Sequence, residues 1–68
     1  NPTSGYVTIV VGDSKLIGTN AQVYDEVGRL IQLVKITANA QTINLATQMN
    51  GVYLIKLANK EILRIVKQ

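Results

Sequence analysis

Apolar and polar residues alternate over short runs along most of this chain. In the run 41–45, Gln41, Ile43 and Leu45 fall on one face, and Thr42 and Asn44 fall on the other. Short runs of this period, rich in Val, Ile, Thr and Tyr, are typical of β-strands. We therefore predict strands at 6–11, 21–24, 29–36, 41–45, 51–57 and 61–67, with a short additional strand at Leu16–Ile17.

Turn residues separate the predicted strands. The segment 25–28 is Asp-Glu-Val-Gly, and Gly28 can adopt the positive φ that closes a bulged hairpin turn. Asn59 and Lys60 separate the last two strands, and Asn tolerates the left-handed conformation, so we expect a tight two-residue turn there. Short strands at spacings of about 8–12 residues predict an all-β fold, an antiparallel β-sandwich or a barrel.

The last two predicted strands are apolar on both faces. A strand with one solvent-exposed face should be apolar on the other face only. Two explanations remain open: loops partly cover the second face, or it is covered by a partner, a neighbouring domain or a second copy. The residues concerned are Tyr53, Ile55 and Leu57 against Val52 and Leu54, and Ile62 and Val66 against Leu63 and Ile65.

Positive charge concentrates near the C-terminus. The net charge is +3, and Lys56, Lys60, Arg64 and Lys67 all lie in the last thirteen residues, against a single acid, Glu61. This charge is either the solvated face of a hairpin or an electrostatic handle for a partner or an anionic surface. Nucleic acid is the weaker third option, because no aromatic residue is spaced among the basic ones for base stacking.

The chemistry of an enzyme is missing from the inventory. The chain has no His and no Cys, so the commonest general base, metal ligand and strong nucleophile are all absent, and we expect no catalytic, metal or cofactor site. The four carboxylates read as turn residues, and Ser4 and Ser14 have no base partner. With 68 residues, beginning at Asn1, we expect a single domain over 1–68 that is a fragment of a larger protein.

Four short motifs occur in an order and spacing that resemble one family, the C-terminal sorting domains of the type IX (Por) secretion system. They are Asn1-Pro2-Thr3-Ser4-Gly5, Val23-Tyr24-Asp25-Glu26-Val27-Gly28-Arg29, Gly51-Val52-Tyr53-Leu54-Ile55-Lys56 and the closing Ile62-Leu63-Arg64-Ile65-Val66-Lys67-Gln68. The resemblance covers essentially the whole chain. The sequence departs from the family at Gln48-Met49, where a Leu-Pro pair is usual, and at Gln68, where the last residue is often Lys or Arg.

The resemblance implies an immunoglobulin-like antiparallel β-sandwich of about seven strands at the end of cargo proteins of Bacteroidota. It further implies passage through the periplasm and the type IX translocon to the outer membrane, the cell surface or the medium. The expected partners are an outer-membrane shuttle protein, the translocon and a sortase that usually removes the domain while attaching the cargo to the surface. It implies no cofactor and no catalytic role.

The motif residues divide into a structural group and a recognition group. We expect structural roles for Pro2, Gly5, Tyr24, Asp25, Gly28, Arg29 and Gly51. We expect partner recognition by the last hairpin: Tyr53, Leu54, Ile55, Lys56, Leu57, Ile62, Leu63, Arg64, Ile65, Val66, Lys67 and Gln68. The alternatives are a structural or adhesive accessory module of a cell-surface protein, or a dimerisation domain that associates through the hairpin or its edge strands.

Overall fold

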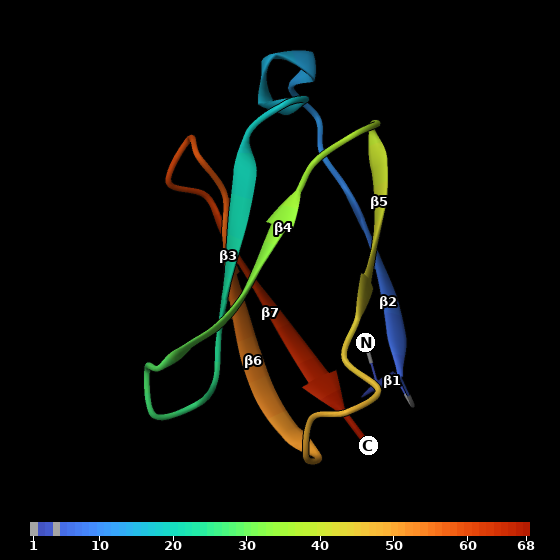
Figure 1. Ribbon diagram of the computed structural model, residues 1–68, viewed down its shortest axis with the longest axis vertical. Helices are drawn as coiled ribbons and strands as arrows, with labels where there is room; N and C mark the ends of the chain where they lie inside the picture. The colour runs from blue at the N-terminus through green and yellow to red at the C-terminus, as the bar shows by residue number, and fades with distance from the viewer. Residues whose placement is uncertain (1, 4) are drawn as a thin grey trace.

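Seven strands form two facing sheets in the computed structural model, which describes residues 2–3 and 5–68, with side chains from Gly5 onward (Figure 1). The larger sheet has the order β1-β7-β6-β3-β4, and the smaller pairs β2 with β5. All pairs are antiparallel except β1 with β7. The strands are β1 Pro2–Thr3, β2 Tyr6–Val10, β3 Asn20–Tyr24, β4 Leu30–Lys35, β5 Ala40–Asn44, β6 Gly51–Lys56 and β7 Ile62–Lys67, with a 3-10 turn, η1, at Ser14–Leu16.

The predicted all-β sandwich of about seven strands is confirmed, and each of the six longer predicted strands ends within one residue of an observed one. The immunoglobulin-like topology stays a prediction. The predicted strand at Leu16–Ile17 is wrong, because this segment continues a 3-10 turn. Asp13 caps that turn by accepting a hydrogen bond from the backbone N–H of Lys15 at 2.9 Å, and Leu16 packs into the core.

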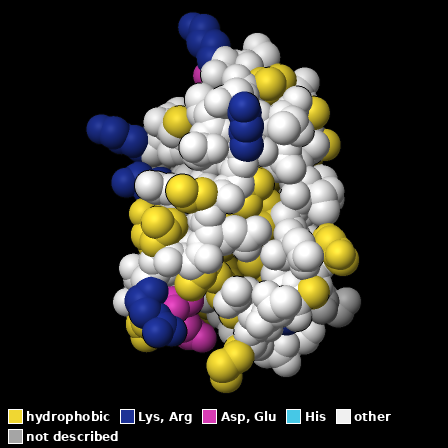
Figure 2. All heavy atoms as spheres, in the orientation of Figure 1, with side chains coloured by type: hydrophobic (Ala, Val, Ile, Leu, Met, Phe, Trp, Pro, Cys, Tyr) yellow, Lys and Arg dark blue, Asp and Glu magenta, His cyan; other side chains and the backbone are white. Residues whose placement is uncertain are grey.

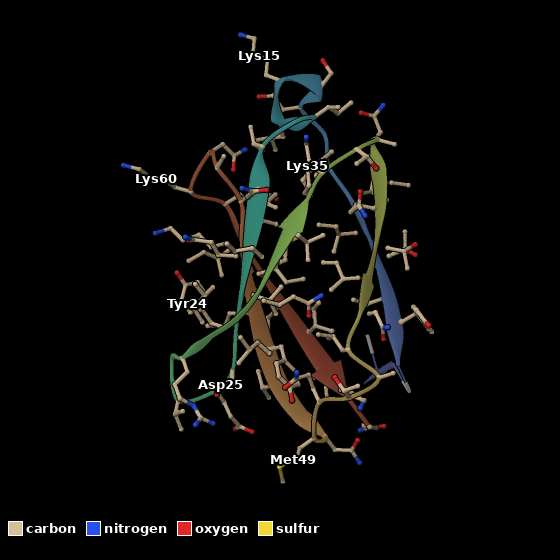
Figure 3. All side chains as sticks on the ribbon, viewed as in Figure 1. Lys15, Tyr24, Asp25, Lys35, Met49 and Lys60 are labelled. Atoms are coloured by element: carbon tan, nitrogen blue, oxygen red, sulfur yellow. The ribbon has the colours of Figure 1, made fainter. Side chains whose placement is uncertain are left out.

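The core lies between the two sheets. Strands β2, β3, β5, β6 and β7 contribute alternate residues to it, as in β2, where Val7 and Ile9 are buried and the intervening Thr8 is exposed. Figure 3 shows these side chains filling the space between the sheets. The buried apolar residues are Val7, Ile9, Val11, Leu16, Ala21, Val23, Ile36, Ile43, Leu45, Tyr53, Ile55, Leu57 and Ile65.

The two hairpins of the larger sheet close with the same kind of bulged turn. In the first, Gly28 N–H donates to the Asp25 carbonyl and Asp25 N–H donates to the Arg29 carbonyl, both at 3.0 Å. In the second, Lys60 N–H donates to the Leu57 carbonyl at 2.9 Å and Leu57 N–H donates to the Glu61 carbonyl at 2.8 Å. The residue two positions before the returning strand has positive φ in both turns, 87° at Gly28 and 73° at Lys60.

The first turn matches the sequence prediction, and the second corrects it. The turn between β6 and β7 has three residues rather than two, and its left-handed residue is Lys60 rather than Asn59. Asn59 instead accepts a hydrogen bond from Glu61 N–H at 2.9 Å through its side-chain oxygen. A side chain that bonds the backbone two residues ahead is the usual role of Asn in turns.

Candidate partner-recognition surface

Strand alternation divides the predicted recognition residues between the core and the solvent. Tyr53, Ile55, Leu57 and Ile65 lie in the core, each at most 5% exposed, and Lys67 is 7% exposed. Leu63 is half-buried and packs against the core. The folded domain therefore offers a partner the other half of the set: Leu54, Lys56, Ile62, Arg64 and Gln68, which are exposed, and Val66, which is half-buried.

The exposed residues of the hairpin form a checkerboard of apolar and basic side chains. Leu54 lies opposite Arg64, and Lys56 lies opposite Ile62. Because side chains of directly opposed residues share a face, the two apolar residues sit on one diagonal and the two cations on the other. Ile62 is 58% exposed and Leu54 is 36% exposed, so both apolar side chains are open to contact.

The same face continues across β3 to β4. Tyr24 lies opposite Leu54 on one side and Leu30 on the other, and Gln22 lies between Lys56 and Leu33 in the same way. Leu30 and Leu33 are 50% and 58% exposed. We call this surface the outer face of the larger sheet: Lys35, Leu33, Leu30, Gln22, Tyr24, Val52, Leu54, Lys56, Ile62, Arg64 and Val66.

Every charged side chain on the outer face is basic: Lys35, Lys56 and Arg64. The acidic residues of the described chain lie at its turns, Asp13 beside η1, Asp25 and Glu26 after β3, and Glu61 before β7. In Figure 2, yellow side chains lie next to dark-blue Lys and Arg side chains along the left side of the molecule. The outer face is thus both apolar and cationic.

Leu30 and Leu33 were absent from the predicted recognition set. Their strand was predicted correctly, but a strand's own pattern does not say which strand lies beside it. Only the order β7-β6-β3-β4 brings them to the face that the hairpin exposes.

Lys67 is buried, unlike the other basic residues of the last hairpin. Its side chain lies on the inner side of β7, at the position paired with Gly51. The Lys67 Nζ donates to the carbonyl of Gln48 and, at 3.4 Å, to the carbonyl of Ala46. An ammonium group this buried requires such acceptors. Lys67 therefore fastens the loop between β5 and β6 to the last strand.

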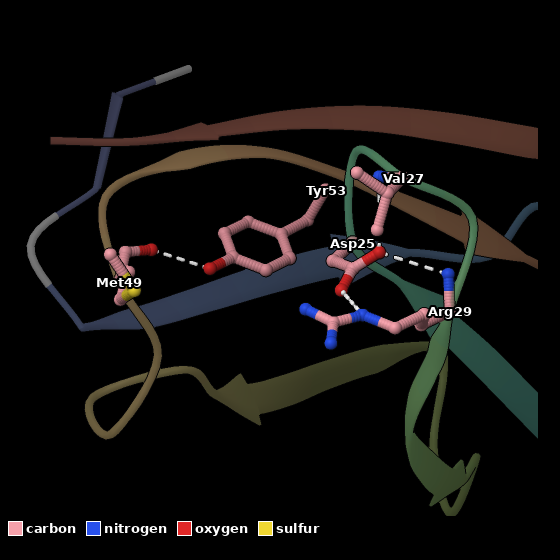
Figure 4. Close-up of polar contacts among 5 residues, drawn as sticks. All are labelled: Asp25, Val27, Arg29, Met49 and Tyr53. Atoms are coloured by element: carbon pink, nitrogen blue, oxygen red, sulfur yellow. Dashed lines mark hydrogen bonds and ion pairs between the residues drawn. The ribbon is translucent and has the colours of Figure 1, made fainter.

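Tyr53 fastens the same loop from the other hairpin strand. Its hydroxyl donates to the carbonyl of Met49, as Figure 4 shows. The ring of Tyr53 is buried at 5% exposure. The loop 45–50, which contains the Gln48-Met49 departure from the family pattern, is thus held by one side chain from β6 and one from β7.

Asp25 organises the turn between β3 and β4. Its carboxylate accepts hydrogen bonds from the backbone N–H groups of Arg29, at 2.9 Å, and Val27, at 3.1 Å, and its second oxygen accepts one from Arg29 Nε at 2.7 Å (Figure 4). These bonds, first that of the Arg29 backbone N–H and then the Arg29 guanidinium, lower the pKa of Asp25. Val27 and Arg29 together satisfy both oxygens of the Asp25 carboxylate. These hydrogen bonds stay within the turn, so Asp25 and Arg29 stabilise the turn.

The remaining predicted structural residues lie at strand ends. Pro2 pairs with Val66 in β1, and the carbonyl of Gly5 accepts from Leu45 N–H at 2.7 Å. The Tyr24 hydroxyl donates to the side chain of Gln22 at 3.0 Å. Gly51 has φ of 154°, and a Cβ there would come within 2.7 Å of a carboxylate oxygen of Glu26. Asn1 and Ser4 of the opening motif lie outside the described residues.

Within residues 2–3 and 5–68, no group of three or more potential ligand side chains could hold a metal ion. Over the same residues, no helix has the length and apolar content needed to cross a membrane. What the described chain offers chemically is a folded scaffold with an apolar, cationic surface, suited to binding.

The comparisons with known proteins agree with the motif pattern. The chain matches the family of secretion system C-terminal sorting domains over residues 1–68. No match was found among the curated proteins or among the solved structures. A sorting domain of this kind interacts with the type IX secretion machinery, its family is not an enzyme family, and its parent protein is exported to the cell surface or secreted. The chain belongs to the secretion system C-terminal sorting domain family, whose members are type IX sorting signals.

Proposed function

We propose that the outer face of the larger sheet is the part of this sorting signal that the type IX machinery binds, with the β6–β7 hairpin at its centre. The observation that carries the proposal is the combination of exposed Leu54 and Ile62 with Lys56 and Arg64 on one face. Apolar side chains at this exposure are costly on a free domain and supply binding energy once a partner covers them. The cations favour a partner of negative potential and speed the encounter.

The partner we propose is the outer-membrane shuttle protein of the type IX system, with a sortase removing the domain after translocation. The sequence lacks catalytic residues, which fits a domain that the machinery recognises and the sortase then removes. If the domain is removed, the molecular mass of the exported cargo should be lower than that of its precursor by about 7.4 kDa, the mass of the domain. Exported cargo that keeps the domain would contradict removal and leave the sorting role intact.

The test fuses residues 1–68 to the C-terminus of a fluorescent protein that is exported to the periplasm. The fusion is expressed in a type IX host with and without a working translocon. We expect fluorescence at the surface or in the medium only with the translocon. Fluorescence that stays in the periplasm of both hosts, with the domain folded, would contradict the sorting role.

Two surface variants locate the binding face. Arg64→Glu with Ile62→Asp places acids on the outer face, while Thr8→Glu with Thr42→Asp places acids on the exposed side of the β2–β5 sheet. We expect the first pair to abolish export and the second to preserve it. The reverse result would move the binding face to the smaller sheet.

A dimerisation domain is the second candidate, and the exposure of Leu33 and Ile62 on the outer face favours it. Sedimentation of the isolated domain tests it. A dimer that Ile62→Asp dissociates would support self-association through the outer face, and a monomer at all concentrations would contradict it.

A further inference from the structure

The outer face of the larger sheet contains an open hollow of about 460 Å³ beside the β6–β7 turn. Strands β3, β4 and β6 and the turn itself form its walls. Strand β1 pairs with the other end of β7, at Val66 and Lys67. The residues that line the hollow include Asn20 and Gln22 of β3, Leu33 of β4, Lys56 of β6 and Lys60 of the turn.

The hollow holds two lysines whose charges are not neutralised within residues 2–3 and 5–68. Lys56 and Lys60 are both exposed, and each ammonium group has three donors and no acceptor. Glu61 follows Lys60 directly, but it forms no ion pair with it and does not line the hollow. Figure 3 shows Lys60 and Tyr24 projecting from the larger sheet on the side away from β2 and β5.

Tyr24 orients the side-chain amide of Gln22 beside the hollow. The Tyr24 hydroxyl donates to Gln22 Oε1 at 3.0 Å, so the amide oxygen already has a partner. Because the oxygen and the nitrogen of an amide point in different directions, Gln22 Nε2 and its two N–H groups are turned away from Tyr24. Gln22 lines the hollow and Tyr24 does not, which places these N–H groups on the side of the hollow. Lys56 lies directly opposite Gln22, so the ammonium and the amide are neighbours on one face.

Lys60 adopts a backbone conformation that favours glycine. Its φ is 73°, and the equivalent residue of the other hairpin turn is Gly28. A residue with a Cβ is strained in this conformation, whereas glycine is not. The lysine side chain is therefore present where the turn alone would favour glycine, as expected for a residue with a binding role.

We propose that this hollow binds a carboxylate of the type IX machinery, an Asp or Glu side chain of the protein that covers the outer face; this rests on the proposed sorting function. Lys56, Lys60 and Gln22 Nε2 all donate, so the ligand must accept hydrogen bonds and carry negative charge. The ligand belongs to a protein, because a sorting domain interacts with the secretion machinery, and the anions of protein side chains are carboxylates. Leu33, 58% exposed, offers apolar contact beside the carboxylate.

Lys60→Gly tests the site without endangering the fold. Glycine accepts the positive φ, so the variant should fold at least as well as wild type while it loses one ammonium group. Lys15→Ala is the matched control, because Lys15 is exposed in η1, outside the hollow, and its loss changes the net charge equally. Thermal unfolding of each reporter fusion checks folding.

Binding of each fusion to the purified translocon with its shuttle protein measures the effect. Loss of a charged donor should weaken binding at least about tenfold in Lys60→Gly. Lys15→Ala should weaken it less than about twofold, and about 1 M salt should remove most of the difference between the two variants. Equal binding by wild type and Lys60→Gly would overturn the carboxylate site.

Tyr24 is a positioning residue, and a double-mutant cycle tests this role. Tyr24→Phe keeps the ring but frees the Gln22 amide to rotate, so binding should fall about two- to tenfold. In a Gln22→Ala background, Tyr24→Phe should have no further effect. Equal effects in the two backgrounds would show that Tyr24 acts independently of Gln22, contrary to the positioning role.

Two probes identify the anion that the hollow binds. The fusion, labelled with ¹⁵N in its glutamines, is titrated with an oligoglutamate peptide and with vesicles of phosphatidylglycerol and phosphatidylcholine. We expect oligoglutamate to shift the side-chain N–H signals of Gln22 in wild type, and to shift them less in Tyr24→Phe. Vesicles that shift these signals where oligoglutamate does not would assign the hollow to a lipid phosphate and overturn a protein carboxylate.

Export of the same fusions separates this inference from the sorting function. Wild-type fusion that is not exported overturns both. Export of Lys60→Gly at the wild-type rate, with wild type exported normally, overturns the carboxylate site alone. We expect wild type and Lys15→Ala to be exported and Lys60→Gly to be retained in the periplasm.

Discussion

Lys67 stabilises the domain from the end of its last strand. In the Lys67→Met variant the side chain keeps its length and most of its apolar contacts but loses the donor to the Ala46 and Gln48 carbonyls. A hydrogen bond from a charged donor contributes about 1.5–3 kcal/mol, so we expect the free energy of unfolding to fall by about that amount. Urea denaturation measures it, with Lys56→Met as the exposed control, for which we expect a change within about 0.5 kcal/mol. Equal effects of the two variants would contradict a buried role for Lys67.

Asp25 gives the stability of the domain a defined dependence on pH. Its pKa is lower in the folded state than the ordinary value, 3.8. The ionised form therefore contributes stability that is fully present above about pH 4 and is lost as the pH falls through the folded-state pKa. We expect Asp25→Asn to flatten the fall in melting temperature below pH 4. Arg29→Gln should flatten it less, because the backbone N–H of residue 29 remains the largest cause of the shift.

The sequence contains enough information to predict that Lys67 is buried. It does not contain enough to predict the hydrogen-bond acceptor of the Tyr53 hydroxyl. Lys67 is two residues beyond Ile65, so the period of two puts both side chains on the same face, and the face of Ile65 is the core. The count of basic residues near the C-terminus did not consider which face of the strand each one occupies. It therefore grouped Lys67 with the exposed charges. The acceptor of Tyr53, the Met49 carbonyl, belongs to an irregular loop whose path the pattern of apolar residues does not determine.

At the scale of elements, the two hairpin turns provide an internal comparison. Both have the same hydrogen bonds and a left-handed residue before the returning strand, Gly28 in one and Lys60 in the other. A residue with a Cβ pays about 1–2 kcal/mol for this conformation. We expect Lys60→Gly to raise the free energy of unfolding by about 0.5–1 kcal/mol, since the greater freedom of Gly in the unfolded chain offsets part of the gain. Gly28→Ala should lower it by about 1 kcal/mol.

Thermal unfolding of both variants against wild type checks this comparison. If Lys60→Gly destabilised the domain, the lysine would be making a contact that outweighs its backbone strain. Lys60→Ala is the control, because it keeps the Cβ and should leave the strain unchanged.

Strands were easier to predict than the segments between them. Val, Ile and Thr in alternation specify a half-buried strand locally, and the ends of β2, β3, β4, β5, β6 and β7 follow from that pattern. The pair Leu16-Ile17 is too short to distinguish a strand from a helical turn. The hydrogen bond from Lys15 N–H to Asp13, together with burial of Leu16, decides in favour of the 3-10 turn.

At the scale of the whole molecule, the binding face depends on strand order. The outer face exists because β3 lies between β6 and β4, which brings Leu30 and Leu33 beside the hairpin. Strand order depends on pairing between residues far apart in the chain. The pattern of apolar residues within each strand does not specify that pairing. The sandwich follows from the pattern of residues, while the extent of its binding surface requires the structure.

The same dependence predicts that export requires the folded domain rather than the last segment alone. Ile43 lies in β5 of the smaller sheet, and its side chain is 1% exposed. It is not among the predicted recognition residues. Ile43→Ala should cost about 2–5 kcal/mol, a large share of the roughly 5–15 kcal/mol that typically stabilises a domain. We expect its export to fall in step with the unfolded fraction, and Thr42→Ala, exposed on the same strand, to be exported normally. An unfolded Ile43→Ala domain that is still exported at the wild-type rate would mean that the machinery reads residues 51–68 as a linear signal. In that case the outer face would have no part in recognition, because it forms only when both sheets are packed together.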